Sequence, residues 1–226
     1  MQTGRYTIVA TAWLAIAGCG AAGPGIADDP PRRLPPLQAT REEKQSRAPS
    51  YMPLSDGARW EYEVVIDLPL GAQKLASAVT RVDGQVEIAG KRYFKVIMQV
   101  HGAPVNPTQV SYYRPTDHGV FQILEGEEKQ GEWLYLPKEL KTGQSWNVVT
   151  PGSKFDFEVV GRNDLTCLGK SYQDCVEIKV EMRGKFGSIT QRQWLAPGVG
   201  LVKQVDDHTL FDSTTELKKF IRETRN

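Results

Sequence analysis

Large apolar residues alternate with polar residues in several short stretches of the chain. The clearest stretch runs from Trp60 to Leu68, where apolar side chains take every second position and acids lie mostly between them. The alternation recurs in three further stretches, Phe94–His101, Phe155–Val160 and Val176–Arg183. A period of two predicts β-strands that bury one face and expose the other to water.

Turn signals built on glycine, proline and asparagine separate these stretches at short intervals. They leave no room for an amphipathic helix of ordinary length, and the best candidate, Pro137–Thr142, is at most one or two turns long. Near the C-terminus, Ser213–Ile221 favours a closing strand. The pattern therefore predicts an all-β fold, an antiparallel meander with little helix.

Two stretches of the chain repeat one pattern. The stretch Gln193–Lys203 has a Trp, a Pro-Gly turn and a second glycine, and Tyr113–Phe121 is a weaker copy of it. Further landmarks keep the same order: Tyr51, Pro53, Leu54, Gly57 and Trp60 match Tyr135, Pro137, Leu140, Gly143 and Trp146, and Gly90–Tyr93 matches Gly169–Tyr172. We expect two similar halves, about 51–125 and 135–205, followed by a closing strand at about 213–221. Joined edge to edge, they would form a strongly curved sheet or a partly open barrel, with Trp194 as a core anchor.

The N-terminus has the features of an export signal. A basic start at Arg5 precedes the apolar run Tyr6–Ile16, which is too short to cross a membrane as a helix. Ile16–Cys19 resembles the bacterial lipobox, which implies that residues 1–18 are a signal peptide and that Cys19 is acylated. The predicted partner of Cys19 is thus the lipid bilayer, because several acyl chains anchor a protein firmly.

Residues 19–50 differ in composition from the rest of the chain. They are rich in Gly, Ala and Pro at first and in charged residues later. Such a segment cannot bury enough apolar surface to offset its ordering entropy. We interpret it as a disordered tether of the lipidated cysteine, and residues 51–226 as a single β domain.

The motifs carry a resemblance to a known group. The lipobox, Pro53–Tyr62 and Trp194–Lys203 resemble a group of uncharacterised bacterial envelope lipoproteins with a curved antiparallel β-sheet, similar in outline to the lipoprotein-carrier fold. The resemblance implies a lipid-anchored protein of the cell envelope, and Gly20 after the cysteine implies the outer membrane facing the periplasm. It implies no catalytic residue.

The charge of the mature chain is balanced. The whole chain has 28 basic and 27 acidic residues, and removal of the signal peptide takes away Arg5. A neutral balance argues against nucleic acid as a partner and against strong electrostatic binding to anionic lipid.

Two cysteines remain besides Cys19. Cys167 and Cys175 are separated by a turn-like segment, which would place them on facing strands, and in an oxidising envelope we expect a structural disulfide. A metal site would need ligands nearby, and no histidine is close in sequence. A redox motif would prefer two intervening residues.

The sequence contains no pattern that predicts catalysis or a cofactor. Gly143–Asn147 lacks the second glycine of a nucleophile elbow and is interpreted as a turn that leads into a strand. His118 is interpreted as a solvated loop residue. Asp206–His208 are consecutive and would point in different directions, so no metal site is predicted.

Aromatic residues are the one enrichment with a bearing on function. Trp133, Leu134 and Tyr135 lack polar alternation and are a candidate binding surface if they are not buried. We expect a non-catalytic envelope protein that binds an apolar ligand, such as a lipid, or another envelope protein. The alternatives are a structural scaffold of an envelope complex and, less favoured, an envelope hydrolase.

Overall fold

The fold is all-β, as the alternating pattern predicts. The computed structural model describes residues 33–34, 50–102, 107–150, 152–184, 187–208 and 211–222. Within these ranges the only helical elements are two short 3-10 turns, Pro69–Gly71 and Glu128–Gln130. The predicted closing strand is present, because β13 covers Phe211–Ile221.

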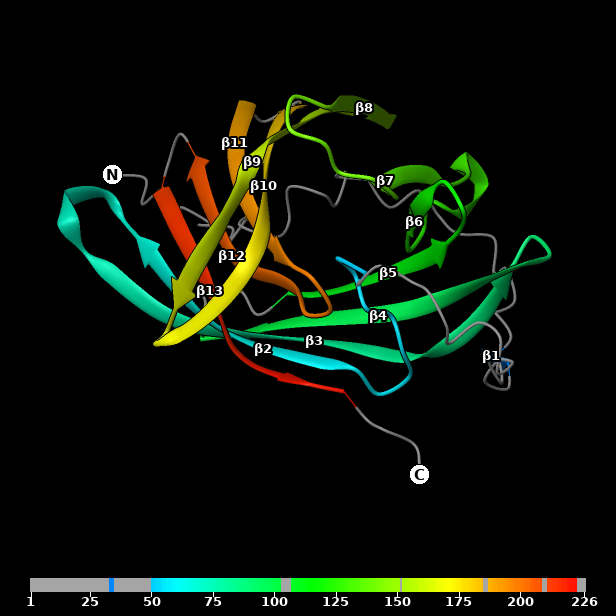
Figure 1. Ribbon diagram of the computed structural model, residues 1–226, viewed down its shortest axis with the longest axis horizontal. Helices are drawn as coiled ribbons and strands as arrows, with labels where there is room; N and C mark the ends of the chain where they lie inside the picture. The colour runs from blue at the N-terminus through cyan, green and yellow to red at the C-terminus, as the bar shows by residue number, and fades with distance from the viewer. Residues whose placement is uncertain are drawn as a thin grey trace, which may run out of the picture.

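Twelve strands follow one another in an antiparallel sheet (Figure 1). Their bounds are β2 (Arg59–Asp67), β3 (Gln73–Ile88), β4 (Lys91–His101), β5 (Thr108–Pro115), β6 (Gly119–Leu124), β7 (Trp133–Pro137), β8 (Ser145–Thr150), β9 (Ser153–Cys167), β10 (Lys170–Gly184), β11 (Gly187–Ala196), β12 (Gly200–His208) and β13 (Phe211–Ile221).

The order of the strands shows how the two halves join. Along the sheet it is β7-β6-β5-β4-β3-β2-β13-β12-β11-β10-β9-β8. Consecutive strands are therefore neighbours in space, except β7 and β8, and the two halves are joined by the pairing of β13 with β2. In Figure 1, β3 and β4 run along the lower side and β9 to β12 stand across them, which gives the nearly closed, barrel-like sheet.

Backbone hydrogen bonds show that the halves are built alike. Val82 accepts from the N–H of Gly57 (3.3 Å) and donates to Ala58 O (2.8 Å). Val159 does the same with Gly143 (2.8 Å) and Gln144 (2.9 Å). This places Gly57 and Gly143 in equivalent turns, and Trp60 and Trp146, three residues further on, at equivalent positions of β2 and β8.

The hairpins β3–β4 and β9–β10 repeat a second detail. Ala89 (φ 49°) and Leu168 (φ 46°) each precede a glycine with positive φ, at the expected offset between halves. Two residues with positive φ are the geometry of the type I′ turn, which suits the twist of a hairpin. A side-chained residue in the first of these positions is strained.

One cluster of buried apolar side chains joins the two halves. It includes Tyr62 of β2, Met98 of β4, Phe155 of β9 and Val202 of β12, and half-buried aromatic residues pack against it. A smaller cluster lies under Tyr93 and Tyr112. The strands thus enclose a hydrophobic core that both halves share.

Trp194 packs against the core cluster, as expected of a core anchor, but it is only half-buried. The buried side chains of β11 alternate through Gln191, Gln193 and Leu195. Burial of a glutamine in place of a tryptophan requires hydrogen-bond partners, and Gln193 donates to Gln191 and to Gln204 Oε1 (3.4 Å).

One short strand lies outside this path. Within the segment interpreted as a tether, Arg33–Leu34 form β1, which pairs with β3 at Val86 and Gln85. The predicted signal peptide, Cys19 and the rest of the predicted tether lie outside the described residues.

Candidate binding site at the open junction

The sheet has two ends, and both belong to strands that are consecutive in the sequence. β7 and β8 are the terminal strands of the path and are joined by residues 138–144. Seven residues span at most about 25 Å when extended, so the two edges lie near each other without pairing. We call this place the open junction.

The outer edge of β2, which is equivalent to the outer edge of β8, is covered by β13. β13 pairs with β12 from Lys203 to His208 and with β2 along its whole length. We call this arrangement of β12, β13 and β2 the closed junction. It is held by Leu217, which is fully buried, and by the ion pair between Lys203 and Glu216 (2.8 Å).

At the closed junction Trp60 of β2 has every partner that it needs. Its ring stacks on Phe220 of β13 with centroids 5.2 Å apart, and its indole N–H donates to Val199 O at 2.6 Å. The side chain is 6% exposed. Trp60 is therefore bonded to the turn before β12 and packed against β13.

At the open junction Trp146 of β8 lacks the equivalent partners. Its ring stacks on Phe157 of the neighbouring β9 (4.9 Å). Its indole nitrogen is buried, and within the described part of the chain it has no hydrogen-bond acceptor. A buried donor without an acceptor costs about 1–3 kcal/mol, which is why such groups often mark a place where something binds.

The outer edge of β8 carries free backbone groups. Val159 donates to Gln144 O, which fixes the alternation along β8. Trp146 and Val148 therefore direct their N–H and C=O groups to β9, and Asn147 and Val149 direct theirs away from it. In the described structure β8 pairs with β9 alone.

The strands at the open junction are also unusual in their composition. Of the strands described, β6, β7 and β8 are the ones without an Asp, Glu, Lys or Arg. Edge strands are normally protected from association by charged residues, prolines or a covering element. Val149 on β8 is 73% exposed, so this edge is both neutral and accessible.

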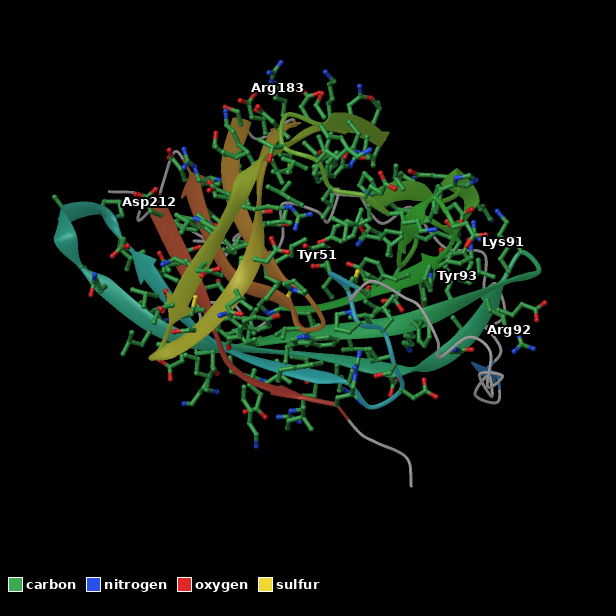
Figure 2. All side chains as sticks on the ribbon, viewed as in Figure 1. Tyr51, Lys91, Arg92, Tyr93, Arg183 and Asp212 are labelled. Atoms are coloured by element: carbon green, nitrogen blue, oxygen red, sulfur yellow. The ribbon has the colours of Figure 1, made fainter. Side chains whose placement is uncertain are left out.

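A shallow cavity of 470 Å³ lies over the start of β8 and over the neighbouring strands β9 and β10. Trp146 and Phe157 form its apolar part, and the outer faces of β8, β9 and β10 supply its polar part: Ser145, Asn147, Asp156, Lys179, Glu181 and Arg183. Figure 2 shows Arg183 projecting from the upper side of the molecule. Its lining of both charges suits a polar chain better than a lipid tail.

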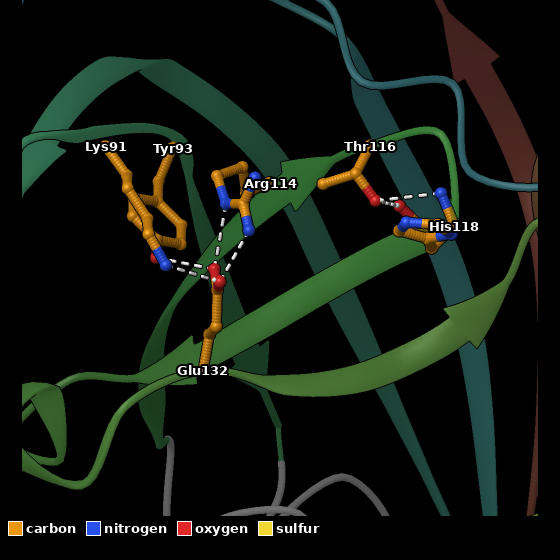
Figure 3. A network of polar contacts seen from close by, with 7 residues as sticks. Lys91, Tyr93, Arg114, Thr116, His118 and Glu132 are labelled. Atoms are coloured by element: carbon orange, nitrogen blue, oxygen red, sulfur yellow. Dashed lines mark hydrogen bonds and ion pairs between the residues drawn. The ribbon is translucent and has the colours of Figure 1, made fainter.

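The other edge, β7, is held in place by a cluster around Glu132 (Figure 3). Glu132 accepts hydrogen bonds from Lys91 (2.8 Å), Tyr93 (2.7 Å) and Arg114 (2.8 Å). The hydrogen bonds from Arg114 are the main reason that the pKa of Glu132 is lowered to about 2. Since Glu132 directly precedes β7, the cluster fixes the start of this strand on β4 and β5.

Glycines allow the close approach of the segments that lead into each half. A Cβ on Gly119 (φ 144°) would lie 2.2 Å from Leu136 O of β7, so no other residue fits there. At the equivalent turn, a Cβ on Gly200 (φ 93°) would meet Pro53 at 3.4 Å. The glycine motif of the sequence is thus a packing site for the segment that leads into the other half.

Arg162 of β9 connects the two halves near the open junction. It binds Asp174 (2.9 Å) and Tyr51, and it donates to Leu140 O (3.0 Å) in the connection between β7 and β8. Figure 2 shows Tyr51 in the middle of the molecule, between the two groups of strands. The connection is therefore anchored to the core, which leaves the edges of β7 and β8 as the accessible part.

The candidate surface Trp133, Leu134 and Tyr135 lies on β7. All three are half-buried, and the Tyr135 ring packs edge-on against Tyr113 (5.4 Å). Burial raises the pKa of Tyr135 to about 12. These side chains contribute to the core, and what β7 offers a partner is its backbone edge more than an apolar patch.

The structure differs from the predicted disulfide. Cys167 and Cys175 are free thiols, and both are buried. Cys167 pairs with Lys170 and Cys175 with Asn163, because the hairpin turns at Leu168 and Gly169, directly after Cys167. The cysteines are thus four positions apart along the ladder, about 13 Å, whereas a disulfide needs Cα atoms within about 7 Å. Burial raises the pKa of each thiol to about 11.

The residues considered for chemistry are spread over the fold. His118 is exposed in the turn before β6, where its N–H donates to Thr116 Oγ1. Asp206 points to the interior and Asp207 to solvent. In the described ranges, His, Cys, Asp and Glu form no group of three or more that would hold a metal ion. A helix long and apolar enough for a membrane span is likewise not found there.

Comparisons with known proteins give a distant similarity of fold. No protein-family profile and no curated protein sequence matches the chain. A Bacteroides fragilis protein, described as exported and as having a YmcC-like fold, matches at 11% identity and a TM-score of 0.44. A Parabacteroides distasonis protein, described as a lipoprotein, matches at 13% identity and a TM-score of 0.41. Each match covers 78% of this chain and all of the other, and neither likeness bears on what this chain does.

The sequence analysis used Trp146 as a landmark of the repeat and considered Gly143–Asn147 as a turn, but it did not single out Trp146, Asn147 or Val149 as a binding site. The signal for them is present in the sequence, since Ser145–Thr150 has strand character and no charged residue. The sequence does not predict that this strand is an edge strand of the sheet.

Proposed function

We propose that this chain is a lipid-anchored protein of the cell envelope whose β domain works by binding and not by catalysis. Its ligand is an extended segment of another envelope protein, which adds to β8 as a further strand. Addition of a strand to a sheet edge gives affinity through backbone hydrogen bonds and specificity through alternate side chains.

The observation that carries the proposal is the neutral, unpaired edge of β8. Asn147 and Val149 direct backbone donors and acceptors outward, and no charged residue on β8 opposes a new neighbour. Trp146 adds a buried N–H that an acceptor on the ligand would satisfy.

A protein segment fits the site better than an apolar ligand does. The core cluster that joins the halves fills the interior with aromatic and aliphatic side chains. The cavity beside β8 is lined mainly by polar and charged groups. A strand uses such an edge directly, whereas a lipid tail would leave its backbone groups unbonded.

The tether of the chain itself is a poor ligand for this edge. Residues 19–50 contain Pro24, Pro30, Pro31, Pro35 and Pro36, and the later part is mostly charged. Proline lacks the N–H that a ladder needs. The partner is therefore sought in another protein.

Site-specific photo-crosslinking in whole cells tests the proposal. A photoreactive residue at Val149 is expected to give one protein adduct whose crosslinked peptide maps to one extended segment. The same residue at Val160, which is exposed on β9, serves as the control position. Adducts only to the chain itself or to lipid would overturn the proposal.

A pair of substitutions at Asn147 makes the test specific for strand addition. Asn147→Pro removes an outward N–H without touching the bonds to β9, and Asn147→Thr keeps it. The Val149 adduct should be lost with proline and kept with threonine. An adduct that survives Asn147→Pro would show contact without strand pairing and would contradict the proposal.

The anchor has its own test. Cys19→Ser is expected to move the protein from the membrane fraction to the soluble fraction, and metabolic palmitate labelling should label the original chain alone. Retention of the variant in the membrane would contradict a lipid anchor at Cys19.

A further inference from the structure

The closed junction shows which strand the open junction accepts. Because Trp60 and Trp146 are equivalent, the pairing of β2 with β13 gives a template for a strand beside β8. We infer that the segment bound by β8 has the side-chain pattern of β13. This inference rests on the proposed function and specifies its ligand.

The register of the closed junction defines the pattern. Trp60 pairs with Phe220, Tyr62 with Leu217 and Val64 with Thr215. The equivalents of these three residues of β2 are Trp146, Val148 and Thr150 of β8. The bound strand therefore places an aromatic residue opposite Trp146, a Leu-sized residue opposite Val148 and a small polar residue opposite Thr150.

The surroundings of Trp146 support an aromatic residue at the first position. Trp60 stacks on Phe220 across the junction, at an interplanar angle of 20°. Trp146 stacks on its other neighbour, Phe157, at 3°. The side of Trp146 that faces the open junction has no such partner among the described residues, and Trp146 is half-buried where Trp60 is buried.

The indole N–H of Trp146 adds a polar requirement. Trp60 donates to the carbonyl oxygen of Val199, a backbone acceptor. The equivalent turn of the first half ends in His118, whose carbonyl oxygen already accepts from Lys138 N (3.0 Å). The indole N–H of Trp146 makes no hydrogen bond to this oxygen, so a backbone carbonyl of the bound segment, near its aromatic residue, can supply the acceptor.

A synthetic peptide of residues 211–221 is the probe. It carries the β13 pattern, and a fluorescent label reports its binding to the purified chain by anisotropy. The control peptide has the same composition, but Leu217 and Lys218 change places, and so do Lys219 and Phe220. A shift of one residue turns each side chain to the other face of a strand, so the control should bind about tenfold or more weakly.

Variants of the chain locate the binding. Asn147→Pro should abolish binding of the β13 peptide and Asn147→Thr should preserve it. Trp146→Phe keeps an aromatic ring, although a smaller one, and removes the N–H, so it should weaken binding severalfold. A photoreactive phenylalanine in place of Phe220 of the peptide should crosslink to residues 145–150.

The outcomes separate this inference from the proposed function. Equal binding of both peptides, lost in Asn147→Pro, would overturn the pattern and leave strand addition standing. Binding of neither peptide while the Val149 adduct persists in cells would do the same. Crosslinks to β2 or β12 would mean exchange with the resident β13 and would overturn the inference. Loss of both the peptide binding and the Val149 adduct would overturn the proposed function itself.

Discussion

β2 and β8 are equivalent strands whose outer edges differ: the edge of β2 is covered at the closed junction, and the edge of β8 is free of any described strand at the open junction. At one, β13 supplies a strand, a stacking partner for Trp60 and a buried Leu217. At the other, no described strand pairs with the outer edge of β8, and Trp146 stacks on Phe157 of its neighbour β9 but has no acceptor for its indole N–H within the described chain. The difference shows that two similar halves can end differently: one edge is covered by β13, and the equivalent edge of β8 is left unpaired in the described structure.

The closed junction also contains a buried polar cluster. Asp206 of β12 accepts from Gln191 of β11 (2.6 Å), from Gln204 (3.0 Å) and from Ser213 of β13 (2.8 Å). Burial raises the pKa of Asp206 to about 6, although these hydrogen bonds lower it. The cluster ties three strands together where the open junction ends in free edges.

The largest difference is expected from apolar truncations at the two junctions. Leu217→Ala should lower the free energy of unfolding by about 3–4 kcal/mol, because it leaves a cavity in a fully buried site. Val149→Ala at the exposed edge should change it by less than about 0.5 kcal/mol. Urea denaturation measures both. Similar losses for the two variants would mean that the β8 edge is not free.

A pH titration of stability tests the buried cluster. The folded pKa of Asp206, about 6, lies above its unfolded value of about 3.9, so the folded state binds the proton more tightly. Its contribution is complete below pH 4 and is lost as the pH rises through 6, about 2–3 kcal/mol in all. Asp206→Asn should flatten this part of the profile, since an amide does not titrate.

Glu132 serves as the reference for that titration. Its pKa is lowered to about 2, so its contribution is present above its unfolded value and is lost at acid pH, below the window of Asp206. An identical slope between pH 4 and 7 in the original chain and in Asp206→Asn would contradict the raised pKa.

Matched substitutions of the two tryptophans compare the junctions directly. Trp60→Phe removes the donor to Val199 O and should cost about 1–2 kcal/mol. Trp146→Phe removes a buried N–H without an acceptor and should stay within about 0.5 kcal/mol of the original stability. Thermal unfolding of the two variants decides this, and equal costs would show that Trp146 has a partner in the free protein.

The smallest expected effect tests whether the halves are equivalent elsewhere. Ala89→Asn and Leu168→Asn place a residue that tolerates positive φ in the two hairpin turns. Each should gain about 0.5–1 kcal/mol, because the strain of the side-chained residue is relieved. A gain in only one half, measured by denaturation, would break the equivalence of the hairpins.

Much of the fold is readable from the sequence, because strand alternation and turn chemistry are local. The alternating stretches at Trp60–Leu68 and Val176–Arg183 correspond to β2 and β10, and the repeated landmarks correspond to repeated hydrogen bonds. The closing strand is likewise predicted by its own residues.

The features that the sequence did not predict depend on register and on distant pairing. The hairpin turns directly after Cys167, at Leu168 and Gly169, and not midway between the two cysteines, so Cys175 lies four positions away along the ladder. In β11, Gln193 is buried because it donates hydrogen bonds to Gln191 and Gln204, and Gln204 in turn donates to Asp206. No local sequence pattern predicts such a network. The pairing of Arg33–Leu34 with β3 is also non-local.

The candidate site was predicted in part. Trp133, Leu134 and Tyr135 were predicted as a candidate surface, and the structure places them half-buried on β7. The importance of β8 follows from the order of the strands, since β13 takes the edge of β2 and leaves the equivalent edge of β8 unpaired. An order of this kind is a property of the whole chain.

The number of strands in the path has a consequence for any partner. Twelve strands, each antiparallel to the next, leave β7 and β8 running in opposite directions. A thirteenth strand makes the count odd, so one that is antiparallel to β8 must run parallel to β7. A ring closed through a thirteenth strand would therefore contain one parallel pair, whichever way the strand runs, whereas the twelve strands of the path pair only in antiparallel fashion.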